Sequence, residues 1–394
     1  MEFAFTEEQK MIRETASGFL ASVSTSAAIR QAMATAQGYD SELWQRICSE
    51  MYWQAIHIPE EYGGLGLGYV ELVAVLEQMG KYLLCSPFFS TVCLATNALL
   101  VAGTAEQKQT YLPQIADGSL TGTLAYTGPS GKWDATGVEV TCKKSGENFI
   151  LNGVLRYVPD GHTADLLIIA ARRAGSTGEN DISLFVIPEV TAGIERQWLP
   201  TMDQTKKQAE IRLDNVTVPA TALMGDEGEA WPQLEKIIHL ANIAVAAEQM
   251  GGAQQVLELT VQYTKERVQF NRTIASFQAI KHKAADMMVK AECAKSAVYY
   301  AACIAQEALF ANKESGGPMA QELPEELPEA ASLAKNYCSD AYFFNAGCAI
   351  QMFGGVGFTW EYDVHLYFKR AKSSETFLGN GAYHREAIAR LLLD

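Results

Sequence analysis

The spacing of apolar residues divides the chain into a helical start, a β-rich middle and a helical end. In the first segment, to about residue 118, Leu43, Ile47 and Met51 recur every four residues. This spacing places the three side chains on one face of a helix. The first segment therefore predicts helices that bury one apolar face each.

Two local signals mark where the first segment starts and where it breaks. Thr6 followed three residues later by Gln9 predicts a capping box at the beginning of the first helix. The stretch at 59–68 contains four glycines, which helices disfavour. We expect a loop there.

The middle segment, about residues 119–226, changes to short runs of β-branched and aromatic residues. The runs lie at 138–140, 149–151, 166–170, 184–187 and 211–219. Asn152-Gly153 and Lys144-Ser145-Gly146 supply turn chemistry between them. The segment predicts a small β domain with a barrel-like or sandwich arrangement.

The last segment, about residues 227–394, returns to helical patterning. We expect helices at 234–265, 278–306, 330–351 and 383–392, with a connecting loop at 314–328 that holds three prolines and two glycines. The chain is thus predicted as an α+β protein. Its domains are an N-terminal helical domain (1–118), a central β domain (119–226) and a C-terminal helical bundle (227–394).

Composition narrows the classes of partner. The net charge of −15 disfavours nucleic acid, which needs a cationic surface. The chain contains no run of eighteen apolar residues, so no membrane span is expected. The acidic N-terminus lacks the features of a signal peptide, so a cytoplasmic location is expected. The eight scattered cysteines read as reduced thiols packed as small hydrophobic residues, and neither they nor the six histidines show metal-ligand spacing.

A basic and aromatic stretch stands between two predicted long helices. Arg267 offers a planar fork for pyrophosphate oxygens, Phe270 a flat apolar face and Gln278 an amide. The residues alone also fit an ordinary helix hairpin with a surface arginine. Both interpretations remain open at this point.

A glycine-rich stretch, Gln351 to Phe358, follows another predicted helix. The adjacent Gly354 and Gly355 would let a ligand approach main-chain amides. A glycine cap at the end of the helix explains the same residues equally well. The two roles are compatible.

Together these stretches resemble the acyl-CoA dehydrogenase family, nearly from end to end. The matching motifs, in order, are Pro59-Glu60-Glu61-Tyr62-Gly63-Gly64-Leu65-Gly66, Arg267-x-x-Phe270 with Gln278, Gln351-x-x-Gly354-Gly355-x-Gly357, and Arg370-Ala371-Lys372. The resemblance implies a helical domain, a β domain and a C-terminal four-helix bundle, with FAD as the cofactor. It also implies α,β-desaturation of an acyl-CoA thioester in lipid metabolism, by β-oxidation, with an electron-transfer flavoprotein as oxidant.

The family's catalytic residue is absent from the matching position. Family members carry a glutamate in the loop after the Ala-Lys motif, and the aligned residue here is Leu378. Some relatives place the base on an earlier helix instead, where this chain has Ala241 followed by Asn242. No catalytic residue is therefore assigned to this chain.

The residues that would hold the flavin ring within the same subunit are also altered. Trp133 replaces a serine, Pro159 a threonine beside flavin N5, and Asn380 and Ala382 a threonine and a glutamine. In the family, Arg267, Phe270, Gln278, Gln351, Gly354 and Gly355 match residues that grip the adenine-dinucleotide end of a neighbour's FAD. The chain keeps the set that serves a neighbour and loses the set that serves itself.

The resemblance and its departures predict a half-site subunit of a heteromeric enzyme, in the manner of a heterotetramer. A homologous partner would supply the catalytic glutamate and the acyl-CoA pocket, and paired enzymes of this kind suggest bulky substrates such as steroid side-chain thioesters. The alternatives are a self-sufficient dehydrogenase with a base relocated to Glu375 or Glu248, a purely structural partner, and a flavin monooxygenase or desulfinase on the same fold.

Overall fold

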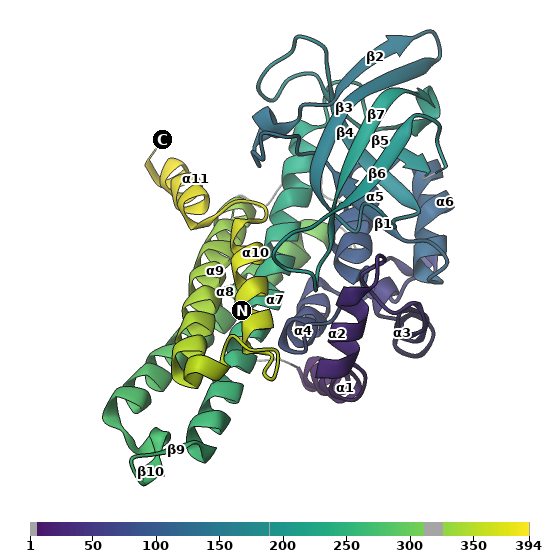
Figure 1. The fold of residues 1–394 in the computed structure, drawn as a ribbon. Coiled ribbons are helices and arrows are strands. Elements are labelled where there is room, and N and C mark those ends of the chain that lie inside the picture. The colour runs from purple at the N-terminus through teal and green to yellow at the C-terminus, as the bar shows by residue number, and fades with distance from the viewer. Residues whose placement is uncertain (1–5, 189, 311–325, 394) are drawn as a thin grey trace. The chain divides into compact units, whose positions relative to one another are not determined.

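The computed structural model describes residues 6–188, 190–310 and 326–393, and the chain divides into two compact units. One unit comprises Met1–Gln31, Tyr69–Leu84 and Asn242–Asp394, and the other comprises Ala32–Gly68 and Cys85–Ala241. The first is built from helices and the second holds the large sheet (Figure 1). Residues of the predicted N-terminal segment contribute to both units.

The helical unit is made of long helices that pack along their lengths. They are α1 (Glu7–Val23), α4 (Tyr69–Lys81), α8 (Gln278–Phe310), α9 (Leu327–Phe353), α10 (Val364–Thr376), α11 (Gly381–Leu393) and most of α7 (Trp231–Glu266), whose first residues belong to the other unit. The short helix α2 (Ser26–Ala34) also spans the unit boundary. Helix α9 lies beside α8, α10 and α11.

Local sequence signals explain where several helices begin. Thr6 caps α1, and its reciprocal bonds with Gln9 form the predicted capping box. A second capping box, between Thr104 and Gln107, starts α6 (Ala105–Ala116), a helix of the other unit. Each box satisfies two main-chain donors that the first helical turn leaves free.

Small residues let two helices of this unit approach closely. A Cβ on Gly80 of α4 would overlap the main chain at Glu248 of α7, and one on Gly251 would overlap the carbonyl of Glu77. Glycine is therefore required at this crossing, because any side chain would push the helices apart.

The sheet unit contains one mixed sheet with the strand order β6-β7-β3-β2-β4-β5-β8, and β1 pairs with β4 in parallel. The strands are β1 (Gly122–Ala125), β2 (Thr141–Ser145), β3 (Asn148–Pro159), β4 (Leu166–Arg173), β5 (Ile182–Pro188), β6 (Ile194–Leu199), β7 (Gln208–Pro219) and β8 (Leu223–Met224). The helices α3 (Ser41–Arg46), α5 (Asn97–Ala102) and α6 (Ala105–Ala116) belong to the same unit.

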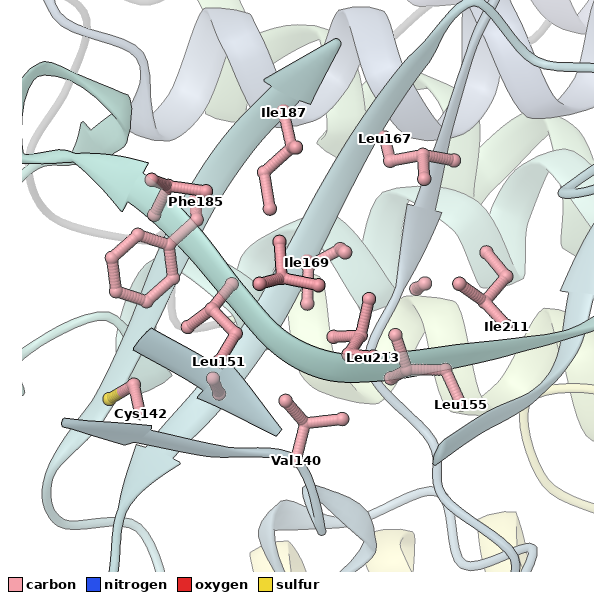
Figure 2. Close-up of a cluster of buried hydrophobic side chains, with 14 of the residues drawn as sticks. Val140, Cys142, Leu151, Leu155, Leu167, Ile169, Phe185, Ile187, Ile211 and Leu213 are labelled. Atoms are coloured by element: carbon pink, nitrogen blue, oxygen red, sulfur yellow. The ribbon is translucent and has the colours of Figure 1, made fainter. Parts of the chain in front are cut away.

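The core of the sheet unit collects apolar side chains from six strands, β1 to β5 and β7. Figure 2 shows Leu151, Ile169, Phe185 and Leu213 converging with their neighbours on one interior. Strand β4 is buried along almost its whole length, as expected for a strand covered on both faces. The predicted strands at 149–151, 166–170, 184–187 and 211–219 all lie in this sheet.

Two details of the predicted β segment are wrong. Val138–Val140 is not a strand, because a short helical turn (Ala135–Gly137) precedes it and pairing begins only at Thr141. Asn152-Gly153 is not a turn, since it lies within β3 and the register to β7 shifts there. This is a β-bulge in β7, where Asp214 and Asn215 lie opposite the single residue Asn152, and Asn215 adopts a positive φ of +49°.

The helical predictions are correct in position and incomplete in number. Helix α10 was not predicted, and neither was the two-residue pairing of β9 (Val268–Gln269) with β10 (Arg272–Thr273). The predicted loop at 314–328 lies for the most part outside the described residues, and its last two residues belong to α9.

The cysteines are unpaired, and six of the eight are buried. Cys293 is exposed and Cys303 is half-buried, so the prediction of eight buried thiols is wrong for these two. Among the helices of the described residues, none is both long and apolar enough to cross a bilayer.

Candidate functional site

A tight hairpin connects α7 to α8 and presents the first motif. The strands β9 and β10 pair Gln269 with Arg272, which leaves Phe270 and Asn271 as a two-residue loop. Both loop residues have positive φ, +53° and +61°, as a type I′ turn requires. This turn projects the Phe270 ring into solvent, where it is 85% exposed.

The two arginines of this hairpin are used differently. The Arg272 guanidinium lies 3.9 Å from the centre of the Phe277 ring. The exposed Arg267 guanidinium has no ion pair or side-chain hydrogen bond within the described residues. Gln278, the first residue of α8, is also exposed, and its Nε2 lies 3.4 Å from Nε2 of His282. Arg267 and Gln278 therefore keep donors that can serve a ligand.

The glycine motif lies at the end of α9. Gly354, at φ +66°, ends the helix, and its amide donates to the carbonyl of Ile350. The structure confirms the helix-cap interpretation of this glycine. A Cβ added at Gly354 or Gly355 would meet no other atom within 4 Å, so the space beside this main chain is open. Gln351, in the last turn of α9, is exposed.

An aromatic contact brings the two motifs to one end of the helical unit. The ring of Tyr263, one turn before Arg267, stacks on Phe353 with ring centres 4.0 Å apart, and its hydroxyl donates to the carbonyl of Phe353. Tyr362 packs edge-on against both rings. These aromatic residues were not predicted to belong to the site. Their positions next to the two motifs in the sequence could have indicated it.

The turn that aligns with the family's catalytic loop lies between α10 and α11. Leu378 has φ +57°, and its side chain is buried. The main-chain carbonyl of Leu378 lies 3.1 Å from Nε2 of His384. Asn380 caps α11 by accepting a hydrogen bond from the amide of Tyr383. A buried leucine side chain offers no proton acceptor here.

The carboxylates considered as relocated bases are engaged or distant in the fold. Glu375 pairs with Lys372 at 2.7 Å. Glu248 follows Ala241 on α7 by seven residues, about 10 Å along the helix axis. Ala241 and Asn242 are themselves buried.

The turn at 127–133 in the sheet unit is closed on itself. The amide of Ser130 donates to Oε1 of Glu139 at 2.9 Å, and the Thr127 hydroxyl donates to the carbonyl of Lys132. The amides of Gly128 and Gly131 also bond within the turn region. Sequence reasoning identified Trp133 but missed Glu139, whose carboxylate lies against Gly128.

The predicted cofactor residues thus share one region of the helical unit, while the altered positions lie elsewhere. Trp133 and Pro159 belong to the sheet unit, and Leu378 and Asn380 to the turn before α11. A polar cavity of about 320 Å³ lies among α1, α4, α7 and α8, and none of the predicted site residues lines it.

Comparison with known proteins identifies the family. The models that match are the N-terminal, middle and C-terminal domains of acyl-CoA dehydrogenase, at residues 6–119, 123–216 and 228–393. The chain belongs to the acyl-CoA dehydrogenase family. Its members are FAD-dependent oxidoreductases, and the three matching domains confirm the predicted fold of helical, sheet and helical parts.

Individual relatives match this acyl-CoA dehydrogenase family member along its whole length. Acyl-CoA dehydrogenase IpdE2 of Mycolicibacterium smegmatis is 32% identical over 386 residues, which is 98% of each chain. Butyryl-CoA dehydrogenase from Megasphaera elsdenii superposes with a TM-score of 0.87 at 27% identity, covering 100% of both chains. A variant of the Tcur3481-Tcur3483 steroid ACAD gives a TM-score of 0.82 at 25% identity, covering 98% of both.

Proposed function

We propose that this chain is one subunit of a heteromeric FAD-dependent acyl-CoA dehydrogenase and supplies one half of a shared flavin site. A homologous partner would hold the flavin ring, the acyl-CoA thioester and the catalytic glutamate. The observation that carries this proposal is the division between the two sets of residues. The dinucleotide-gripping set is exposed and open, while the turn that should carry the base presents a buried leucine.

The exposed set fits the adenine-dinucleotide end of FAD. Arg267 keeps a free fixed charge for pyrophosphate oxygens, and Phe270 offers an uncovered ring. Gln278 and Gln351 are exposed amides, and the open main chain beside Gly354 permits close approach of a ligand. When bound, FAD supplies the hydride acceptor of the reaction.

The sheet unit of this chain fits the flavin ring poorly. A flavin edge needs free main-chain donors, and the amides of Gly128, Ser130 and Gly131 are already bonded inside the chain. Pro159 has no amide hydrogen to donate. These features support a role in which the flavin ring lies mainly in another subunit.

The chain offers no proton acceptor at either family position. Leu378 and Ala241 cannot ionise, and Glu375 is held in an ion pair with Lys372. A base relocated to Glu375 would have to give up that pair and move out of the last turn of α10. The self-sufficient alternative is therefore not favoured.

The substrate and further partners follow from the family. We expect an acyl-CoA thioester, and the printed name of the Tcur3481-Tcur3483 relative, a steroid ACAD, supports a bulky acyl group. An electron-transfer flavoprotein would reoxidise the flavin, with all components in the cytoplasm as two chains of each kind.

Cofactor stoichiometry tests the proposal directly. The chain should be purified alone and with candidate homologous partners, and the bound flavin measured from the visible spectrum after denaturation. We expect a colourless chain alone, and about one FAD per pair of subunits in the complex. A homomer with one FAD for each copy of this chain would refute the half-site role and leave the fold assignment intact.

A matched pair of variants tests the contact itself. Arg267→Ala should weaken FAD retention in the complex about ten- to a hundredfold, because a charge-assisted hydrogen bond contributes about 1.5–3 kcal/mol. Lys265→Ala removes a nearby exposed charge at the end of α7 and should leave retention unchanged. Equal FAD affinity in both variants would count against the assigned role of Arg267.

A further inference from the structure

A lysine is completely buried beneath the turn that aligns with the family's catalytic loop. Lys335, in the middle of α9, has an exposed fraction of 0%. Its ammonium donates three hydrogen bonds: to Oγ of Ser339 at 3.1 Å, to the carbonyl of Glu375 at 3.1 Å and to the carbonyl of Gly379 at 2.9 Å. The two carbonyls lie on either side of Leu378, so one side chain joins both ends of the turn.

Burying an ammonium group is costly, and within the part of the chain that the structure describes no carboxylate bonds to Lys335 directly. The nearest acidic side chain on the turn, Glu375, directs its carboxylate to Lys372 instead. Two of the three acceptors of Lys335 are main-chain carbonyls at and after the C-terminal end of α10, where the helix dipole is negative. A cation at this place satisfies carbonyls that the helix end leaves free.

A series of side-chain hydrogen bonds connects Lys335 to the neighbouring helices through Ser339. The hydroxyl of Ser339 donates to Oε1 of Gln249 at 3.3 Å, and Nε2 of Gln249 donates to Oγ of Ser374 at 3.1 Å. Gln249 and Ser339 are both buried. The network therefore ties α7, α9 and α10 together in one unit, with Lys335 at the end that faces the turn.

The carbonyls at and around position 378 are contacted by side chains from α9 and α11. Lys335 contacts the carbonyls of Glu375 and Gly379, and His384 of α11 lies against the carbonyl of Leu378. Leucine rarely adopts the left-handed conformation that Leu378 has, because its Cβ crowds the following carbonyl. The surrounding contacts must impose this conformation.

We propose that Lys335 is a positioning residue that clamps the turn from Glu375 to Gly379 and so determines where residue 378 lies. In this proposal the turn keeps its main-chain conformation although position 378 no longer carries a base. The conformation does not depend on which side chain occupies that position. The interpretation of position 378 as the site of a lost base rests on the proposed function. The clamp itself rests only on contacts within this chain.

Local hydrogen exchange of the full-length chain tests the clamp. Lys335→Met keeps the length of the side chain and removes all its donors. Peptides covering 372–384 should exchange at least tenfold faster than in the unmodified chain, while peptides from α8 remain unchanged. Such a local effect separates positioning of the turn from a general loss of stability.

The matched control is another buried lysine with a main-chain acceptor. Lys207, in the sheet unit, donates to the carbonyl of Thr35 and is 3% exposed. Lys207→Met should leave exchange at 372–384 unchanged. Unaltered exchange of these peptides in Lys335→Met, or equal acceleration in both variants, would overturn the proposal.

A second variant keeps the test decisive if Lys335→Met does not fold. Lys335→Gln retains two donors on a shorter side chain that cannot reach both carbonyls, and it should also accelerate exchange at 372–384. Retention of full protection in this variant would contradict the clamp. Because the readout needs no flavin and no partner, an FAD stoichiometry that refutes the half-site role would leave this result intact.

Discussion

The arm at Arg267–Gln278 and the turn at Glu375–Gly379 belong to the same helical unit, yet they are built in opposite ways. The arm presents Arg267 and Phe270 to solvent and uses few internal contacts. The turn buries Leu378 and has its carbonyls bonded by Lys335 and His384. A region whose side chains are exposed is suited to binding another molecule, and a region whose carbonyls are bonded internally is suited to holding its own shape.

This difference separates the loss of a catalytic group from the loss of a structure. Leu378 removes the proton acceptor, but the clamp around it persists. The sheet unit differs again, because the amides of its turn at 127–133 donate hydrogen bonds to Glu139 and to main-chain carbonyls. Under the proposed function, the first turn lacks a proton acceptor because of the side chain at position 378, and the second lacks free amides because they are bonded within the chain.

The largest expected effect is on the free energy of unfolding, and it appears when one glycine from each region is replaced. Gly379 has φ +100°, and a Cβ there would overlap the ring of Tyr383, whereas Gly355 faces open space. Gly379→Ala should therefore lower the free energy of unfolding by about 2–4 kcal/mol, from backbone strain and overpacking together. Gly355→Ala should change it by less than about 0.5 kcal/mol. Urea denaturation of both variants measures the two changes in unfolding free energy. Equal decreases would contradict the difference proposed between the two regions.

The next effect concerns the protonation of the clamp. Burial lowers the pKa of Lys335 from its ordinary value near 10.5 to about 7, and Cys338, Glu375 and Asp340 oppose that shift by charge. Between these two values the unfolded chain binds the proton more strongly, so the contribution of Lys335 to stability rises with pH.

Relative to Lys335→Met, the unmodified chain should gain up to about 1.4 kcal/mol of unfolding free energy per pH unit between pH 7 and 9. Denaturation curves at three pH values would measure this slope. His384 and the remaining ionisable groups are present in both chains, so their effects cancel in the difference. A difference that is constant with pH would show that Lys335 does not change its protonation in this range.

A smaller effect should appear only with cofactor and partner present. Gly355→Val places a side chain in open space, so the chain alone should keep its stability. In the complex, the added methyl groups should obstruct the main chain and weaken FAD retention about tenfold, or roughly 1.4 kcal/mol. Gly347→Val, in the interior of the preceding helix α9 and also facing open space, is the control. Unchanged FAD content in Gly355→Val would argue against a ligand at this glycine.

The smallest effect is expected at Glu375. Its ion pair with Lys372 is partly exposed and contributes little to stability. Glu375→Gln should leave desaturation by the assembled complex within about twofold of its original rate, because the proposed function assigns the base to the partner chain. A fall of several orders of magnitude, with flavin retained, would identify Glu375 as a relocated base and break the comparison between arm and turn.

Much of the fold could be predicted from local patterns. The capping box at Thr6 and Gln9 and the long helical runs at 234–265 and 278–306 depend on interactions within a few residues, and the structure confirms them. The stretch at Arg267 and Phe270 stood out through its family resemblance, and its role in holding the cofactor stays a prediction. These features follow from sequence because their causes are close together along the chain.

Tertiary structure decided the features that depend on distant partners. Asn152-Gly153 has the composition of a turn, but pairing with β7 places it inside β3, opposite a bulge in β7. Lys335 looks like an ordinary helix lysine in the sequence, and only the packing of α10 and α11 onto α9 buries it and supplies its acceptors. Sequence alone determined which groups this chain has kept and lost, and packing decided which of them are bonded internally and which remain free for a ligand, because burial and hydrogen-bond partners come from residues far apart in the chain.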